Sequence, residues 1–541
     1  MLTRVDDVVR CGDPDRPAVT YQDETLSYGE LTRRVGRAAS GLRRLGLRRG
    51  ERVVVYLEKR IETVVAMLAV SAAGGVFVPV NPLFKPQQVG YVAADCGAVA
   101  VVTSVERHRL VGARLQEVES LRHLILIGDR PRVPEPLPVT PWSQLCASDE
   151  EGSAPEGVNA SEAGPAPEGV DASEAGPAPE GVIDADVAAI LYTSGSTGSP
   201  KGVVLSHRNL LAGARSVAHY LGHTRDDVVL GVLPLSFDTG FSQLTTSFIA
   251  GAHVVLVNYL VPGAVVRLCA RHGVTGLTCV PPLWLQLAAQ TWPEAATRRL
   301  RYFANTGGRL PKPALDSLRA TFPQARPYLM YGLTEAFRST YLDPEQVDRR
   351  PDSIGKAIPN AEILVVRPDG GVCEPGEKGE IVHRGALVAL GYWNDPERTA
   401  ERFRPYPPGG SPWGSELAVW SGDVAYRDDE GFIYFVGRTD EMIKTSGYRV
   451  SPSEIEEAAY ATGLVGEAVA FGVADDTLGQ QVVLVVSGPS GAACDTETLV
   501  KALERDLPRY MVPRRVVVRD RLPRSGNGKF DRTELRRSVT W

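Results

Sequence analysis

The sequence lacks any close pairing of cysteines. Its 7 cysteines are spread along 541 residues, from Cys11 to Cys494, and none forms a CxxC pair or a Cys/His cluster with the spacing of metal ligands. This distribution excludes a small disulfide-stabilised scaffold and disfavours a structural zinc site. We expect free thiols in a reducing compartment.

The sequence also lacks a strong excess of charge of either sign. Its 59 Lys and Arg against 65 Asp and Glu give a formal net charge of -6. Such a chain has no overall attraction to nucleic acid or to an anionic membrane surface. We therefore expect neither as a partner, and any phosphate that the protein binds must be held by local groups.

No stretch has the pattern of a signal peptide or a membrane helix. Residues 1–16 are charged throughout, and the longest apolar run, 63–80, is interrupted by Gly74, Gly75 and Pro79. We interpret this run as a buried helix followed by a core strand. A cytoplasmic protein without a membrane span is the expectation.

Alternating helical patterns and short apolar strands fill most of the first half. Hydrophobic residues make up 43% of the chain, which is typical of a globular protein. Helical periodicity over 31–45 is followed by a series of short apolar runs, and the same rhythm resumes after residue 183. The expected strands are 51–57, 76–80, 98–103, 123–128, 253–257, 276–280, 302–306 and 327–332. This pattern predicts an α/β fold built of layers.

A repeated segment interrupts that rhythm between residues 154 and 185. The unit APEGVNASEAGP recurs there with little change and has almost nothing to bury. Because its copies carry no hydrophobic face, a solenoid is excluded. We interpret the segment as a flexible acidic surface insert.

The sequence pattern changes again after Ser353. Short apolar runs separated by Gly and Pro turns predict an antiparallel β subdomain there. From about Glu441 a smaller α+β region begins. Its expected elements are helices from Ser453 and Thr496 and strands at 468–473, 481–486 and 515–520. This region is large enough to be a domain of its own.

A loop rich in glycine and hydroxyl groups, YTSGSTGSPKG at 192–202, is the most prominent motif. The backbone N–H groups and hydroxyls of such a loop can surround a polyphosphate, and Lys201 can offset its charge. It is not a Walker A loop, because Pro200 precedes the lysine and Gly202 follows it. Taken alone, the loop is equally well explained as a flexible turn.

Further motifs make this loop resemble the ATP signature of the adenylate-forming superfamily, which contains acyl-CoA synthetases, luciferases and the adenylation domains of peptide synthetases. The motifs follow in the family's order and span nearly the whole chain. They are NTGG at 305–308, YGLTE at 331–335, SGD at 421–423, GRTDEMIKTSGYR at 437–449 and PRSGNGKFDR at 523–532. Ser421 stands where many relatives have Thr.

The resemblance implies the fold of acyl-CoA synthetases and their reaction. It implies a large N-terminal domain over 1–439, a hinge at Asp440 and a small mobile C-terminal domain over 441–541. The family converts a carboxylic acid and ATP into an acyl-AMP and pyrophosphate, since a free carboxylate is a poor electrophile. ATP, Mg²⁺ and coenzyme A are the implied cofactors. A non-catalytic nucleotide-binding protein is the alternative, against which the complete set of motif lysines and acids argues.

The resemblance assigns the catalytic roles residue by residue. Two anions must meet, so positive charge is needed at the line of attack. Lys529 is similar to the lysine that bridges the carboxylate and the α-phosphate. Glu335 resembles the Mg²⁺ ligand, and Thr334 a hydroxyl donor to the α-phosphate. After rotation about Asp440, Lys444 belongs to the face that admits the thiol.

The nucleotide site follows from the same motifs. Asp423 resembles the carboxylate that accepts both ribose hydroxyls, with Arg438 beside it. Tyr331 is similar to the aromatic residue that stacks on adenine. The full set of implied nucleotide ligands is Thr193, Ser194, Gly195, Ser196, Thr197, Gly198, Lys201, Gly307, Gly308, Tyr331, Gly332, Thr334, Asp423, Arg438 and Lys529.

We expect a free thiol as the acyl acceptor and no fused carrier domain, since only residues 533–541 follow the last motif. The implied thiol entry is formed by Lys444, Gly447, Tyr448 and Arg449. The chain is most similar to stand-alone bacterial acyl-CoA ligases, including a group associated with exosortase systems. Coenzyme A is the expected acceptor; a separate carrier protein, or transfer of the adenylate to a partner, stays open.

The family pattern places the acyl pocket along two segments and one tryptophan. Its implied lining is Phe237, Asp238, Phe241, Ser242, Trp284, Gly332, Leu333, Phe337 and Arg338. Most of these are apolar, which favours a hydrophobic acid. Asp238, however, stands where amino-acid-activating relatives bind the substrate ammonium, unless Arg338 neutralises it. An amino acid or another polar acid therefore stays an alternative.

Overall fold

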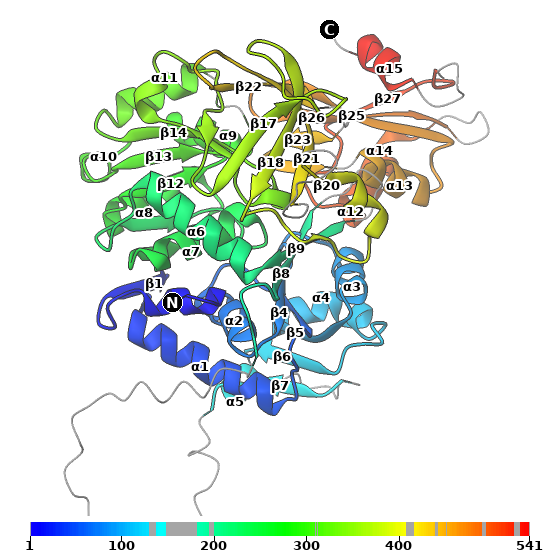
Figure 1. Cartoon of the computed structure of the whole chain (residues 1–541). Coiled ribbons are helices and arrows are strands. Elements are labelled where there is room, and N and C mark those ends of the chain that lie inside the picture. The colour runs from blue at the N-terminus through cyan, green and yellow to red at the C-terminus, as the bar shows by residue number, and fades with distance from the viewer. Residues whose placement is uncertain are drawn as a thin grey trace, which may run out of the picture.

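An eight-stranded sheet forms one layer of the N-terminal part (Figure 1). The structure, a computed structural model, describes residues 2–128, 137–147, 181–193, 200–308, 310, 312–406, 416–438, 442–450, 452–488, 494–523 and 531–539. The strand order is β19-β9-β8-β4-β3-β5-β6-β7, in which β8 to β7 are parallel and β9 and β19 antiparallel to their neighbours. The strands are β3 (Arg52–Tyr56), β4 (Val76–Pro79), β5 (Ala98–Ser104), β6 (His123–Ile127), β7 (Val139–Pro141), β8 (Val187–Thr193), β9 (Lys201–Ser206) and β19 (Gly391–Tyr392). The central strands are continuous apolar runs because both of their faces are buried.

A nine-stranded sheet forms the second layer, in the order β16-β15-β14-β13-β12-β10-β11-β1-β2. Its strands are β1 (Pro17–Tyr21), β2 (Glu24–Ser27), β10 (Val228–Gly231), β11 (His253–Leu256), β12 (Gly276–Cys279), β13 (Tyr302–Asn305), β14 (Arg326–Tyr331), β15 (Thr340–Leu342) and β16 (Lys356–Ala357). Strands β13 and β14 are parallel neighbours, so the two motifs that follow them begin at the same edge of the sheet.

Helices connect and cover these sheets. They are α1 (Tyr28–Arg44), α2 (Ile61–Ala72), α3 (Pro86–Asp95), α4 (Val105–Leu115), α5 (Trp142–Leu145), α6 (His207–Leu221), α7 (Asp238–Ile249), α8 (Pro262–His272), α9 (Pro281–Ala288), α10 (Glu294–Thr297) and α11 (Lys312–Thr321), with a 3-10 turn at Val5–Arg10. Capping residues fix where two of the long helices begin. Ser27 caps α1 and Ser206 caps α6, each accepting a hydrogen bond from the backbone N–H three residues later.

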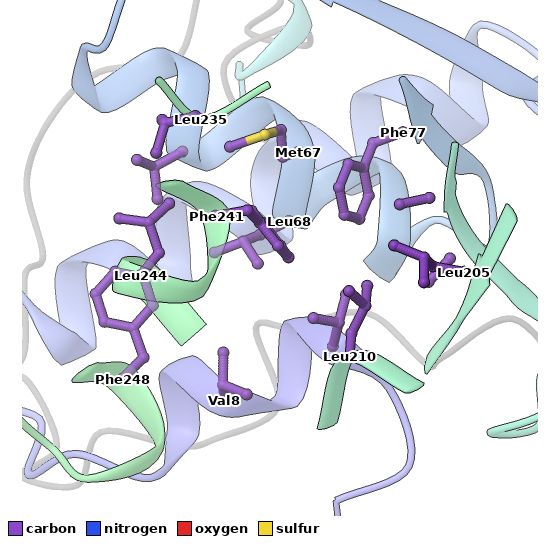
Figure 2. Close-up of a cluster of buried hydrophobic side chains, with 14 of the residues drawn as sticks. Val8, Met67, Leu68, Phe77, Leu205, Leu210, Leu235, Phe241, Leu244 and Phe248 are labelled. Carbon is purple, nitrogen blue, oxygen red and sulfur yellow. The ribbon is translucent and has the colours of Figure 1, made fainter. Parts of the chain in front are cut away.

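The core of the N-terminal part joins both layers through α2. Ten of its residues are buried, and Met67 and Leu68 face Phe241 of α7. Figure 2 shows these side chains converging with Phe77 of β4 and Leu205 of β9. Each fully buried side chain of this size contributes roughly 1.5–3 kcal/mol to folding. The expected buried helix followed by a core strand is confirmed, and within the described ranges no helix is long and apolar enough to cross a membrane.

The antiparallel β subdomain expected after Ser353 is confirmed. Its strands pair in the order β17-β18-β21-β20, and β22 also pairs with β21. The elements are β17 (Ala361–Val366), β18 (Lys378–Gly385), β20 (Phe403–Pro405), β21 (Leu417–Arg427), β22 (Ile433–Arg438) and the helix α12 (Pro396–Arg402). The sheet carries its own small cores, one of them around Ile381 and Ala425.

The C-terminal region is a separate sheet with helices and two cores of its own. The order β24-β23-β26-β25 is extended by β27, which pairs with β26. The elements are β23 (Ile443–Thr445), β24 (Tyr448–Val450), α13 (Pro452–Ala461), β25 (Glu467–Asp475), β26 (Gly479–Ser487), α14 (Thr496–Asp506), β27 (Arg515–Val518) and α15 (Arg532–Val539). The five expected elements of this region are thus present. The 7 cysteines are all free thiols, also as expected.

Candidate active site

A lysine, a glutamate and a tyrosine from three separate segments meet beside the glycine-rich loop. Lys201 begins β9, Glu335 lies in the short turn Thr334–Ala336, and Tyr392 ends β19. The Lys201 Nζ atom lies 3.0 Å from Glu335 Oε1 and 2.8 Å from the Tyr392 hydroxyl. That hydroxyl donates to Glu335 Oε1 at 2.7 Å. Pairing of β19 with β9 brings the tyrosine here.

Electrostatics keeps the Glu335 carboxylate ionised. Burial alone would raise its pKa, but the charges of Lys201 and Arg449 and the hydrogen bond from Tyr392 outweigh burial, so the pKa of Glu335 is held well below its usual range. Burial lowers the pKa of Lys201, which the charge of Glu335 partly offsets. The result is a buried anion that requires a cation next to it.

Glu335 could hold a divalent ion together with a substrate. Within the described ranges, no group of three or more His, Cys, Asp or Glu residues is arranged to bind a metal. A single buried carboxylate fits Mg²⁺, which usually takes one or two carboxylates and completes its coordination with waters and phosphate oxygens. The donor set therefore suits an ion that arrives with a nucleotide.

A second pair of polar side chains lies where β14 and β21 approach each other. The Tyr331 hydroxyl donates to Asp423 Oδ2 at 2.5 Å. Burial and the neighbouring Asp423 raise the pKa of Tyr331 well above its usual value. The turn before Asp423 is fixed by Ser421, whose hydroxyl donates to the Ile381 carbonyl at 2.7 Å and accepts from the Asp423 N–H at 3.0 Å. Asp423 is thus an immobilised acceptor on an inner strand of its sheet.

The glycine-rich loop begins and ends in register. Thr193 of β8 pairs with Lys201 of β9, so the two ends of the loop are held by an antiparallel ladder. The Thr193 hydroxyl is buried and has no hydrogen-bond partner among the described residues. The other predicted loop ligands, Ser194, Gly195, Ser196, Thr197 and Gly198, lie outside the described residues, as do Lys529, Asp440 and the side chain of Arg438.

Gly307 and Gly308 lie close to the first residue of α9 and the residue before it. A Cβ atom on Gly307, whose φ is +76°, would be 3.3 Å from Val280 Cγ1, and one on Gly308 would be 3.2 Å from Pro281 Cγ. A side chain at either position would therefore press against Val280 or Pro281.

The predicted acyl-pocket residues contain a buried ion pair. Arg338 Nη1 lies 2.9 Å from Asp238 Oδ2, and the two side chains are only 3% and 12% exposed. The same nitrogen donates to Thr239 Oγ1 at 3.2 Å. Burial raises the pKa of Asp238, and Arg338 opposes that rise. The carboxylate of Asp238 already has a fixed cationic partner.

Three other predicted pocket residues lie inside the core. Phe241 packs against Phe77, with 5.0 Å between ring centroids, and Trp284 donates from Nε1 to the Ala304 carbonyl at 3.1 Å. Phe337 fills the space in front of Gly213. All three have no exposed surface, so contact with a substrate would require their neighbours to move. Ser242 and Leu333 are also buried, while Phe237 and Gly332 are partly open.

The turn between β23 and β24 reaches this site from the C-terminal region. Gly447 has a φ of +80°, and a Cβ atom there would lie 2.9 Å from both methyl groups of Val280. The next residue, Tyr448, stacks on Tyr510 at 3.7 Å and meets the edge of Phe237 at 5.4 Å. The Nζ atom of Lys444 lies 4.5 Å from the ring centroid of Phe435.

Two contacts at the start of α3, one from Gln88 in the helix and one from Lys85 just before it, join the C-terminal region in this position. Gln88 Nε2 donates to Glu454 Oε1 at 2.7 Å, and Lys85 Nζ donates to the carbonyl of Glu504 at 3.1 Å. Both acceptors belong to helices of the C-terminal region, α13 and α14. No pattern in the sequence indicated these contacts or the position of Tyr392.

Comparison with known proteins gives two family matches. Residues 9–393 match the family model described as AMP-binding enzyme, and residues 454–529 match the AMP-binding enzyme C-terminal domain. Among curated relatives, a feruloyl-CoA synthase of an Amycolatopsis species is 31% identical over 529 residues, covering 97% of this chain and 96% of the relative.

Two solved structures of one enzyme, the o-succinylbenzoate CoA synthetase of Bacillus subtilis, match to different degrees. A double mutant bound with a product analogue has a TM-score of 0.81 at 26% identity, covering 100% of this chain and 99% of that chain. The same synthetase in complex with its acyl-adenylate intermediate has a TM-score of 0.66 at 26% identity, covering 99% and 98%. The arrangement of this chain is thus more similar to the product-analogue complex.

Proposed function

The chain belongs to the AMP-binding enzyme family and is an AMP-forming acid–CoA ligase, and from this premise we propose how its residues divide the two half-reactions. In the first, a carboxylate attacks the α-phosphate of ATP, which forms an acyl-AMP and releases pyrophosphate. In the second, the thiol of coenzyme A attacks the acyl carbon and AMP leaves. The main observation that supports this proposal is the buried group of Lys201, Glu335 and Tyr392 at the C-terminal end of the glycine-rich loop.

The first half-reaction needs positive charge where two anions meet. We assign Lys201 to the phosphate chain and Lys529 to the bridge between the carboxylate and the α-phosphate. Mg²⁺ held at Glu335 would offset the phosphate charge when the nucleotide is bound. Asp423 accepts the ribose hydroxyls, and Tyr331, fixed by its bond to Asp423, stacks on the base.

The second half-reaction uses the face that now covers the site. We propose that the C-terminal domain rotates about Asp440, and that the described arrangement is the thioester-forming one. The close approach of Gly447 to Val280 and the higher similarity to the product-analogue complex support this proposal. In this arrangement Gly447 leaves the space through which a phosphopantetheine thiol enters, with Lys444 at its side.

Two variants test this division of labour. Lys529→Ala should lose pyrophosphate exchange but still convert synthetic acyl-adenylate to the thioester. Lys444→Ala should keep the exchange and slow that conversion. Equal loss of both activities in Lys529→Ala, or unchanged thioester formation in Lys444→Ala, would contradict the proposed roles.

For the acid we propose a hydrophobic substrate. The carboxylate of Asp238 is held by Arg338, so a substrate ammonium would have to compete with a buried guanidinium for it. A pyrophosphate-release screen over fatty, aromatic, terpenoid and amino acids, with and without coenzyme A, tests the proposal. Turnover with an amino acid alone would contradict it, and turnover only with a phosphopantetheinylated carrier protein would replace coenzyme A as the acceptor.

We also propose that the enzyme works in the cytoplasm, where ATP and coenzyme A are available. Its 7 free thiols suit that reducing compartment.

A further inference from the structure

Arg402 is a basic residue outside every motif, yet its helix is tied to the active site. It ends α12, which packs against β19 and β21. The helix is anchored to the active-site strand because the Tyr392 N–H donates to Thr399 Oγ1 at 2.9 Å. Arg402 lies one helical turn after Thr399. The backbone of Arg402 is therefore held in a fixed position relative to the Lys201, Glu335 and Tyr392 group.

The guanidinium of Arg402 lies against the turn that presents Asp423. A Cβ atom on Gly422 would lie 2.4 Å from Arg402 Nη1 and 3.1 Å from Nη2. Nη1 also donates to the carbonyl of Trp420 at 3.1 Å. Residue 422 must therefore be glycine for this arginine to occupy its place, quite apart from the φ of +72° at that position.

The charge of Arg402 also reaches the other side of the site. Burial lowers the pKa of Lys201, and the positive charge of Arg402 adds to that lowering. Burial raises the pKa of Tyr392, and Arg402 opposes that rise. The guanidinium is thus close enough to interact with the Lys201 group while touching the turn that carries Asp423.

A phosphate must lie between these two sides. Asp423 is the proposed ribose acceptor, whereas Lys201 and Glu335 are proposed to face the phosphates and their metal ion. The first phosphate after the ribose has to cross the space between them, next to the turn that the guanidinium contacts. A guanidinium has five N–H donors in a planar fork, which suits a carbonyl and a phosphate oxygen at once.

We propose that Arg402 binds the α-phosphate of the nucleotide, in ATP, in the acyl-adenylate and in AMP. The proposal rests on the proposed function, since it needs a nucleotide at this site. It adds to the motif residues a phosphate ligand that is carried by the N-terminal part, and that therefore stays in place when the C-terminal domain moves.

Calorimetric titration of Arg402→Met with adenosine, AMP and Mg-ATP tests the proposal. A charge-assisted hydrogen bond to phosphate is lost, so AMP should bind about 10- to 100-fold more weakly than to the unaltered enzyme, and Mg-ATP should lose affinity in the same direction. Adenosine should bind within about twofold of its normal affinity, because it has no phosphate.

Arg398→Met is the matched control. Arg398 lies one turn earlier on α12 and pairs with Asp395 at 3.3 Å, so its replacement removes the same charge from the same helix. It should leave AMP binding unchanged. Thermal unfolding reports whether each variant is folded.

Arg402→Lys keeps the test decisive if Arg402→Met does not fold. An ammonium cannot serve the Trp420 carbonyl and a phosphate with the same planar fork, so AMP should bind roughly fivefold more weakly, with adenosine unaffected. AMP affinity unchanged in the folded Arg402 variant would overturn the proposal, and so would an equal loss for adenosine and AMP. Absence of pyrophosphate exchange in the unaltered enzyme would instead refute the proposed function.

Discussion

Replacing Gly447 by alanine should slow thioester formation selectively. The added methyl group would lie 2.9 Å from Val280 Cγ1 and Cγ2 and 3.0 Å from Cβ, closer than carbon atoms approach without displacement. This overlap occurs only while the C-terminal region covers the site. The first half-reaction, which we propose uses the other arrangement, should therefore proceed at nearly its normal rate.

The size of the effect follows from separating two costs. A φ of +80° at residue 447 costs alanine roughly 1–2 kcal/mol, but this cost belongs to the hairpin in both arrangements and cancels between them. The overlap with Val280 is confined to one arrangement and costs about 1–3 kcal/mol, as overpacking usually does. Thioester formation should therefore fall by roughly 5- to 150-fold.

The assay compares two rates on the same preparation: pyrophosphate exchange, and conversion of synthetic acyl-adenylate to acyl-CoA. Val280→Ala removes the two methyl groups with which the new Cβ atom would overlap. The double variant with Gly447→Ala and Val280→Ala should therefore recover most of the lost rate of thioester formation. Val280→Ala alone is the control. Equal slowing of both rates by Gly447→Ala, or no recovery in the double variant, would refute the reasoning.

Three further predictions concern the polar groups. Tyr392→Phe removes the hydroxyl that contacts both Glu335 and Lys201, so pyrophosphate exchange should fall about 10- to 100-fold, whereas Tyr426→Phe in the β subdomain should leave it unchanged. The lowered pKa of Glu335 stabilises the fold above the ordinary carboxyl pKa near 4.3, and this contribution is lost only as the pH falls through the lowered value. The melting-temperature difference between the unaltered enzyme and Glu335→Gln should therefore stay constant from about pH 8 to pH 5; narrowing within that range would contradict the pKa direction. Gln88→Ala removes a contact of the described arrangement, so it should slow thioester formation several-fold without changing pyrophosphate exchange, and equal slowing of both would show that the contact is not specific to one arrangement.

Local signals predicted the elements of this fold well. The apolar runs at 51–57, 76–80 and 98–103 became the parallel strands β3, β4 and β5, because continuous apolar sequence is typical of strands buried on both faces. The helix over 61–72 followed from the same reasoning. Periodicity and turn residues are properties of short segments, so a single sequence carries them.

Long-range placement was not predictable in the same way. Tyr392 lies 191 positions after Lys201 and reaches it because β19 pairs with β9. Arg402 is brought to the same region because its helix follows β19. The family pattern predicts Trp284 in the acyl pocket, and this stays a prediction; its ring has no exposed surface in the core around Phe303. Contacts of this kind depend on tertiary packing, which no periodic pattern in the amino-acid sequence indicates. The roles of Lys529 and Asp440 stay predictions.

The most direct measurement follows an oxygen atom. If an acid labelled with ¹⁸O in its carboxylate is converted to its coenzyme A thioester, formation of an acyl-AMP leaves one carboxylate oxygen on the α-phosphate. When the thiol attacks the acyl carbon, that oxygen departs with AMP. Mass spectrometry should therefore find one ¹⁸O atom in AMP and none in pyrophosphate. Label in inorganic phosphate or pyrophosphate, or unlabelled AMP alongside acyl-CoA, would contradict the proposed chemistry.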